Sequence, residues 1–117
     1  MKSLSEFWNE HLERCGFVLS DGTVVEVPNI HEDPQFGFRV DPQEILRYEE
    51  QIVASWHTHP HGGPNLSMED YRCFLDWPKW THFIVHRGKV WAYYVEQNRV
   101  LLHDDLDFSR LPRGAVP

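Results

Sequence analysis

The sequence has few cysteines and few basic residues. Cys15 and Cys73 are the only cysteines among 117 residues, whereas a small secreted domain held together by disulfides would contain more of them. We expect both to be free, buried thiols. Eighteen acidic residues outnumber eleven basic ones, which gives a formal net charge of −7. This balance argues against a nucleic-acid partner bound through its phosphates.

The sequence also lacks long apolar runs. None approaches the roughly twenty residues that a membrane-spanning helix needs. Met1 to Glu10 contains acidic residues and no apolar segment, unlike a signal peptide. We therefore expect a cytoplasmic protein with no membrane partner. In contrast, 41% of the residues are hydrophobic and 14% are aromatic, which is typical of one folded domain with a modest core.

The spacing of apolar and turn-forming residues predicts one α/β domain over residues 1–103 and a flexible tail over 104–117. Asp41 is expected to cap a helix that begins at Pro42. We expect the first and third helices to pack on a curved mixed sheet. The predicted helices are residues 3–14, 42–50 and 67–76, and the predicted strands are residues 16–20, 23–27, 51–59, 81–86, 89–95 and 99–103.

The strand over residues 51–59 shows period-two alternation. Both of its faces carry apolar residues, which predicts a central strand covered on both sides. The alternation places one set of side chains on one face (Val53, Ser55, His57 and His59) and another set on the opposite face (Ile52, Ala54 and Trp56).

His57 and His59 are therefore expected to point the same way from one strand. At this spacing both imidazoles can reach one ion at about 2.0–2.1 Å. Pro60 ends the strand, and the chain then returns with the carboxylate of Asp70. Structural zinc sites use four protein ligands, usually including cysteine, whereas catalytic sites supply about three. Two imidazoles, one carboxylate and no cysteine indicate an open, hydrolytic zinc site, although a pair of histidines alone is more often structural.

Ser67 and Asp70 have two compatible interpretations. Ser-x-x-acid before an apolar helical run is typical of a helix capping box. A helix that begins beside the metal can also present Asp70 from its first turn, with its positive dipole end toward an anion. The Ser67 hydroxyl would then lie near a developing oxyanion. The base that such a site needs stays open at this point, because several acids compete (Glu6, Glu10, Glu13 and Glu26).

These residues resemble the signature of a known enzyme family. His57-Thr58-His59-Pro60, the seven residues from Pro60 to Leu66, and then Ser67 and Asp70 are similar to the motif of the JAMM (JAB1/MPN+) metalloproteases. Upstream, Glu13-Arg14-Cys15-Gly16 resembles the Glu-x-Cys-Gly segment at the end of that family's first helix. The resemblance covers Leu12 to Val95 and implies an MPN/JAB-like α/β fold, related to that of cytidine deaminases.

The resemblance also implies a role for each residue of the motif. One Zn²⁺ per chain would be held by His57, His59 and Asp70, with water as the fourth ligand. Glu13 would be the general base, and Ser67 would steady the tetrahedral intermediate. The family cleaves peptide or isopeptide bonds, often at the C-terminus of ubiquitin or a ubiquitin-like β-grasp protein. A protein or peptide substrate of this kind is therefore implied.

One position departs from the family pattern, because His61 stands in a loop where glycine is common. Exposure is the simplest interpretation; a substrate contact and a spare ligand are the alternatives. Within the family, segments such as Cys15–Phe17 and Val27–Ile30 resemble the N-terminal half of the tail-tip assembly proteins of lambdoid phages. There a JAMM-type domain precedes a cysteine peptidase. We expect a stand-alone, bacterial or phage-encoded domain.

Two other functions stay open at this stage. The chain could be a non-catalytic scaffold, active in tail assembly or in binding a ubiquitin-like protein, with zinc structural or absent. It could also be a zinc hydrolase that acts on a different amide. The sequence does not indicate the substrate or the oligomeric state.

Overall fold

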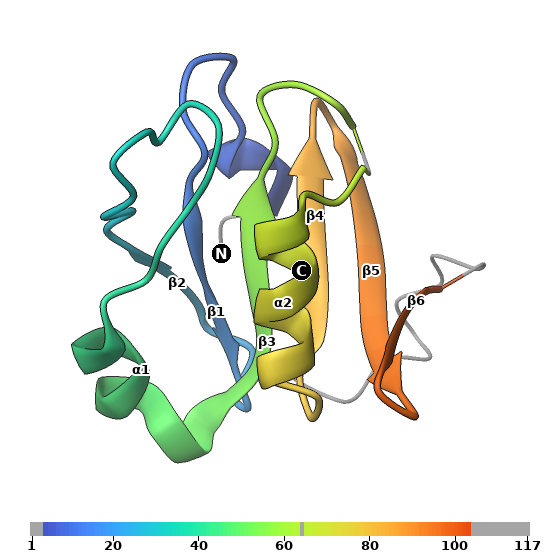
Figure 1. Ribbon diagram of the computed structural model, residues 1–117. Coiled ribbons are helices and arrows are strands. Elements are labelled where there is room, and N and C mark those ends of the chain that lie inside the picture. The colour runs from blue at the N-terminus through green and yellow to red at the C-terminus, as the bar shows by residue number, and fades with distance from the viewer. Residues whose placement is uncertain (1–3, 64, 104–117) are drawn as a thin grey trace.

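Six strands form one mixed sheet in the order β2-β1-β3-β4-β5-β6. The computed structural model (Figure 1) describes residues 4–63 and 65–103, so the expected tail over 104–117 lies outside the described residues. Every neighbouring pair is antiparallel except β3 and β4, which are parallel. The strands are β1 (Cys15–Leu19), β2 (Val24–Val27), β3 (Ile52–Thr58), β4 (Thr81–His86), β5 (Lys89–Glu96) and β6 (Arg99–Leu102).

Two α-helices were predicted correctly, and local sequence explains both. Helix α1 (Pro42–Tyr48) is followed by a 3-10 turn, η2 (Glu49–Gln51), and the Asp41 side chain accepts a hydrogen bond from the Gln43 N–H at 2.9 Å. Helix α2 (Met68–Asp76) has Ser67 as its N-cap. A parallel strand pair needs a crossover connection, and α2 lies within the one that joins β3 to β4, across the front of the sheet in Figure 1.

The expected helix over residues 3–14 is wrong. In the described part of this segment only Leu4–Phe7 is helical, as a single 3-10 turn, η1. The Asn9 side chain accepts hydrogen bonds from the backbone N–H groups of His11 and Leu12, and such local bonds compete with helix formation. Glu13 therefore lies in irregular chain just before β1, where its N–H donates to the carbonyl of Pro34 at 2.7 Å.

The sheet separates two sides of the core. Behind it in Figure 1, η1 covers one cluster (Leu4, Phe7, Val18, Ala54, Trp56, Phe83, Val85 and Ala92). On the α2 side, β1, β2 and β3 carry a second cluster (Cys15, Phe17, Leu19, Val27 and Ile52), and α2 covers a third (Phe74, Ile84 and Tyr93). The prediction that the central strand is covered on both sides is confirmed. Burying these faces supplies most of the favourable free energy of folding.

The predicted alternation of β3 fails at its first two residues. Leu19 pairs with Ile52 while Val18 pairs with Ala54, so Val53 is an extra residue in the ladder. Such a bulge exchanges the faces of the residues before it. Ile52 consequently joins the cluster on the α2 side, and Val53 packs against the cluster behind the sheet. From Ala54 onward the predicted faces are correct.

Turns and one close contact fix the sheet's register. Hairpin turns at Asp21-Gly22 and Arg87-Gly88 join the predicted strands, and Arg87 and Gly88 both have positive φ, at 51° and 71°. Gly16 is required for another reason. A Cβ there would lie 1.8 Å from the Val25 carbonyl oxygen and 2.8 Å from the Trp56 ring. Glycine at this position lets Trp56 cover β1.

In the described part of the chain, no helix is long and apolar enough to cross a membrane.

Candidate metal centre

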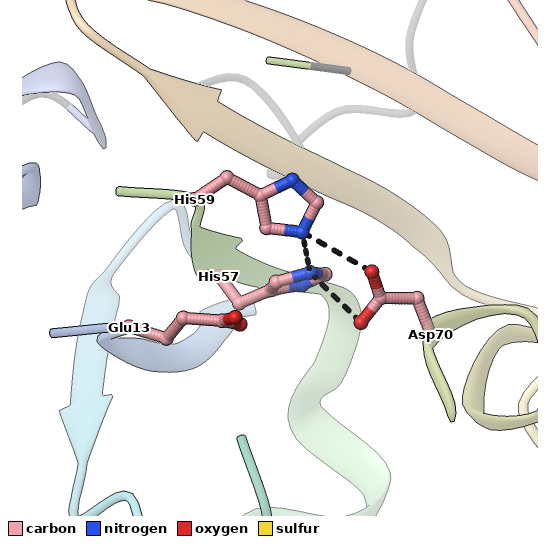
Figure 2. A group of neighbouring side chains, drawn as sticks. All are labelled: Glu13, His57, His59 and Asp70. Atoms are coloured by element: carbon pink, nitrogen blue, oxygen red, sulfur yellow. Dashed lines mark hydrogen bonds and ion pairs between the residues drawn. The ribbon is translucent and has the colours of Figure 1, made fainter. Parts of the chain in front are cut away.

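The ladder between β1 and β3 brings the first candidate residues together. Cys15 pairs with His57, and just beyond this pair the Thr58 N–H donates to the Arg14 carbonyl at 2.8 Å. The Arg14 N–H in turn donates to Thr58 Oγ1 at 2.8 Å. Glu13, which precedes β1 in the chain, therefore lies beside His59, which follows the last residue of β3. Figure 2 shows the Glu13 carboxylate directed toward His57.

Helix α2 brings the fourth residue to the same point. Asp70 lies in its first turn, and Oδ1 and Oδ2 lie 3.3 Å from His57 Nε2 and 3.1 Å from His59 Nε2 (Figure 2). The two Nε2 atoms are 3.0 Å apart. Glu13 completes the group, because one potential ligand atom from each of the four residues lies within 4.8 Å of all the others. All four side chains are buried.

Ser67 and Asp70 form the complete capping box predicted from the sequence. The Ser67 Oγ accepts a hydrogen bond from the Asp70 N–H at 3.0 Å, and Asp70 Oδ2 accepts one from the Ser67 N–H at 3.1 Å. Asp70 is therefore both a member of the helix cap and a candidate metal ligand. The bond to the Asp70 N–H uses a lone pair of Ser67 Oγ, so the hydroxyl hydrogen stays available to a ligand.

A hydrogen bond orients His59, and ring stacking orients His57. The His59 Nδ1–H donates to the Gly63 carbonyl at 2.9 Å, which leaves Nε2 as the atom with the free lone pair. His57 is fully buried, and its ring stacks on Phe38 with centroids 4.2 Å apart. Glu13 Oε1 is buried and has no hydrogen-bond partner among the described residues. This donor set fits a divalent cation that prefers nitrogen and oxygen ligands, such as zinc.

Burial and hydrogen bonding shift the pKa values of all four residues. Burial raises the pKa of Glu13 to about 8 and lowers the pKa of His57. Burial also opposes ionisation of Asp70, but the neighbouring His57 and His59 and the Ser67 N–H hold the pKa of Asp70 far below its usual range. These shifts favour neutral His57 and ionised Asp70, which are the forms that bind metals. At His59, burial is outweighed by hydrogen bonds to Asp70 and the Gly63 carbonyl, which raise the pKa, so metal binding there would displace a proton.

A cavity of about 140 Å³ opens beside the four residues. Glu13, Ser67 and Asp70 line it, together with His61 and Phe36 from the surrounding loops. His61 is exposed, as expected, and it is outside the four-residue cluster found among the described residues. The cavity gives a small molecule or a peptide carbonyl access to the cluster from solvent.

Several contacts around His59 could not be read from the sequence. The Trp8 Nε1–H donates to the His59 carbonyl at 2.8 Å, and the His86 Nδ1–H donates to the same oxygen at 2.6 Å. Phe38 likewise comes from the segment between β2 and α1, for which the sequence predicted no helix or strand. No local pattern shows that these distant residues meet His57 and His59, because their contacts depend on the tertiary structure.

Comparison with known proteins assigns this arrangement to a family. A family model that describes prokaryotic homologs of the JAB domain matches residues 6–100. The chain belongs to this family. The predicted resemblance to JAB1/MPN+ proteins and the predicted JAB-like α/β fold are therefore confirmed. Among curated protein sequences, no match is found.

A solved structure supports the fold of this JAB-domain homolog. The solution structure of protein DSY2949 from Desulfitobacterium hafniense superposes with a TM-score of 0.64 at 20% sequence identity. The match covers 79% of this chain and 75% of that protein. At this identity the comparison supports the fold alone. The structure and the family together give a JAB-domain homolog with a buried cluster of Glu13, His57, His59 and Asp70 that could bind a metal ion.

Proposed function

We propose that this JAB-domain homolog is a zinc-dependent metallopeptidase that hydrolyses a peptide or isopeptide bond. One observation carries the proposal. Three side chains with the chemistry of zinc ligands converge on one point, and the fourth member of the cluster, Glu13, brings a buried carboxylate oxygen with no hydrogen-bond partner among the described residues. A structural site would use all its positions for protein ligands, whereas this set leaves room for a water and a base.

Different residues of this chain would bind the metal and transfer the proton during hydrolysis. His57, His59 and Asp70 would hold one Zn²⁺, which when bound supplies a Lewis acid and lowers the pKa of a bound water. Glu13 takes a proton from the attacking water and passes it to the departing amine. In the metal-free protein burial raises the pKa of Glu13 to about 8, which makes its carboxylate a stronger base than an exposed glutamate.

Ser67 contributes to the same step from the start of α2. Its hydroxyl lines the cavity and is proposed to donate a hydrogen bond to the oxyanion that develops on the substrate carbonyl. The N-terminus of α2 points its positive dipole end toward the same cavity, which adds a favourable field for negative charge. Glu13 and Ser67 are therefore the proposed catalytic residues.

The proposed substrate is a protein or peptide tail, such as the C-terminus of a ubiquitin-like β-grasp protein or a phage tail protein. Family resemblance supports this substrate class. A cytoplasmic setting is part of the proposal. A larger cavity of about 380 Å³ lies next to the metal centre, and the same Phe38 that stacks on His57 lines it. Its apolar walls include Phe17, Val40 and Trp80, which suit an apolar side chain of such a tail.

The test compares Glu13→Gln with Glu10→Gln, an exposed glutamate of the same irregular segment. Protein purified without chelator is analysed for zinc, and turnover is measured with fluorogenic peptide amides that end in Gly-Gly. We expect about one zinc per chain in all three proteins. Turnover should fall at least about 100-fold in Glu13→Gln and stay unchanged in Glu10→Gln.

Two results would contradict the proposal in different ways. Full activity in zinc-loaded Glu13→Gln would show that Glu13 is not the base. Less than about half an equivalent of zinc in the wild type, with no difference in His57→Ala, would favour a non-catalytic scaffold instead.

A further inference from the structure

The segment between β2 and α1, residues 28–41, contains no helix or strand and yet contacts the metal centre at several points. The carbonyl of Pro34 accepts the Glu13 N–H at 2.7 Å, and Phe38 stacks on His57. His31 Nε2 lies 3.1 Å from Glu69 Oε2 at the start of α2. A segment without secondary structure needs other hydrogen bonds to hold such positions.

Asn29 supplies these bonds from a single side chain. Its Nδ2 donates to the carbonyls of Glu13 at 2.9 Å and Gly37 at 3.0 Å. Its Oδ1 accepts from the N–H groups of His31 at 3.1 Å and Arg39 at 2.9 Å. Two donors and two acceptors are the full capacity of a primary amide. Aspartate has the same shape but no donor, so it would place a carboxylate oxygen against two carbonyls.

These four bonds connect Glu13 to the aromatic wall of the site. The backbone of Glu13 is held at its N–H by Pro34 and at its carbonyl by Asn29. Gly37 and Arg39 flank Phe38, so the amide that fixes Glu13 also fixes the residue that stacks on His57. The Glu13 carboxylate and the His57 ring are thereby held in a fixed position relative to each other.

We propose that Asn29 is a positioning residue that sets the placement of Glu13 relative to the metal ligands. The inference rests on the proposed role of Glu13 as the base. Asn29 does not line the cavity, and its side chain contacts Glu13 only at the backbone carbonyl. It therefore acts through the backbone of Glu13 and through Phe38. A small displacement of a base relative to its substrate lowers turnover without removing the metal ligands.

The test uses Asn29→Asp, with Asn98→Asp as the matched control. Asn98 lies in the exposed β5–β6 turn at φ 61°, which aspartate also tolerates. A second control, Asp21→Ala, removes another bond from a side chain to the backbone, the one to the Thr23 N–H. We expect kcat on a Gly-Gly peptide amide to fall about 10- to 100-fold in Asn29→Asp, with KM and zinc content near wild-type values. Both controls should keep wild-type turnover.

Hydrogen exchange in the metal-free protein gives a readout that does not depend on catalysis. We expect the Glu13 amide to exchange at least about 10-fold faster in Asn29→Asp and at the wild-type rate in both controls. Wild-type exchange at Glu13 together with wild-type kcat would overturn the positioning role and leave the proposed function intact. If the wild type turns over no peptide, the proposed function fails and the exchange result alone decides the role of Asn29. If Asn29→Asp does not fold, Asn29→Ala is measured in the same two ways.

Discussion

The ring of Phe38 stacks on the ring of His57, with centroids 4.2 Å apart and planes inclined by 22°. This contact joins an irregular segment of the chain to the central strand of the sheet, and it restricts the rotation of a candidate metal ligand. His57 has no hydrogen-bond partner at Nδ1 among the described residues. Packing, rather than a second hydrogen bond, therefore orients this imidazole.

Replacing Phe38 by leucine should weaken zinc binding. The stack would be lost while the site stays apolar, and an aromatic pair contributes about 0.5–1.5 kcal/mol beyond its buried area. We expect the zinc dissociation constant, measured by competition with a chelator, to rise about 3- to 10-fold. Phe36→Leu is the matched control, because Phe36 is 66% exposed and should leave the constant unchanged. Equal constants in all three proteins would show that the stack does not orient His57.

Removing the metal should lower thermal stability. A ligand that binds only the folded protein stabilises it by about 2.7 kcal/mol at a concentration 100 times its dissociation constant, which corresponds to roughly 10 °C for a domain of this size. We expect chelation to lower the Tm of the wild type and of His61→Ala by this amount. It should leave the Tm of His57→Ala unchanged, and an equal shift in His57→Ala would place the metal elsewhere.

His82 should make the protein less stable in acid. The Ser55 hydroxyl donates to His82 Nδ1 at 2.6 Å, and the His82 Nε2–H donates to the Trp77 carbonyl at 2.9 Å, so the neutral ring is fully hydrogen-bonded. Burial lowers the pKa of His82 to about 4 from its usual 6.5. The unfolded chain therefore binds the proton first, and stability is lost as the pH falls from about 6.5 toward 4.

The size of this loss is about 3 kcal/mol between pH 7 and pH 4, from about 1.4 kcal/mol for each unit of pKa shift. Urea unfolding of metal-free protein at several pH values measures it. His82→Gln should be less stable at pH 7 and should show a shallower dependence on pH in this window. His103→Gln, at the end of the described chain, is the control and should keep the wild-type slope. An unchanged slope in His82→Gln would assign the acid sensitivity to other groups.

Ser67 should affect both stability and turnover. Ser67→Ala removes the acceptor for the Asp70 N–H, which costs about 1 kcal/mol for a typical N-cap. It also removes the proposed oxyanion donor, for which a loss of about 100-fold in kcat is expected. Ser67→Thr keeps the hydroxyl and should retain most of both. Loss of stability with full turnover in Ser67→Ala would limit Ser67 to the helix cap.

Local sequence patterns were sufficient for most elements of this fold. The strands from β1 to β6, helices α1 and α2 and the hairpin turns follow from period-two alternation, capping residues and glycine in turns, all of which act between near neighbours. Two predictions failed, namely the helix over residues 3–14 and the faces of the first two residues of β3. Both depend on hydrogen bonds that the local pattern does not show. Residues 8–14 do not form a helix, because Asn9 binds nearby N–H groups and Glu13 bonds to Pro34. The bulge at Val53 depends on pairing with β1.

For the site, the chemical types of the ligands and their spacing could be read from the sequence alone. It showed two imidazoles on one strand and a carboxylate in the first turn of a helix, and the capping box fixed how Asp70 is presented. It left four glutamates as candidate bases, and only family resemblance distinguished them. In the tertiary structure Glu6 and Glu10 are exposed, and Glu26 pairs with Arg14 at 2.6 Å.

Only the tertiary structure brought Glu13 to the cluster and buried it there. The antiparallel pairing of β1 with β3 places it beside His59, and Asn29 and Pro34 hold its backbone. These contacts join residues that are far apart in the chain, by 46 positions for Glu13 and His59 and by 57 for Glu13 and Asp70, and no repeat along the sequence encodes them. The physical reason is that ligand type and helix capping depend on neighbours in the chain, whereas burial and the convergence of ligands depend on how the strands pair.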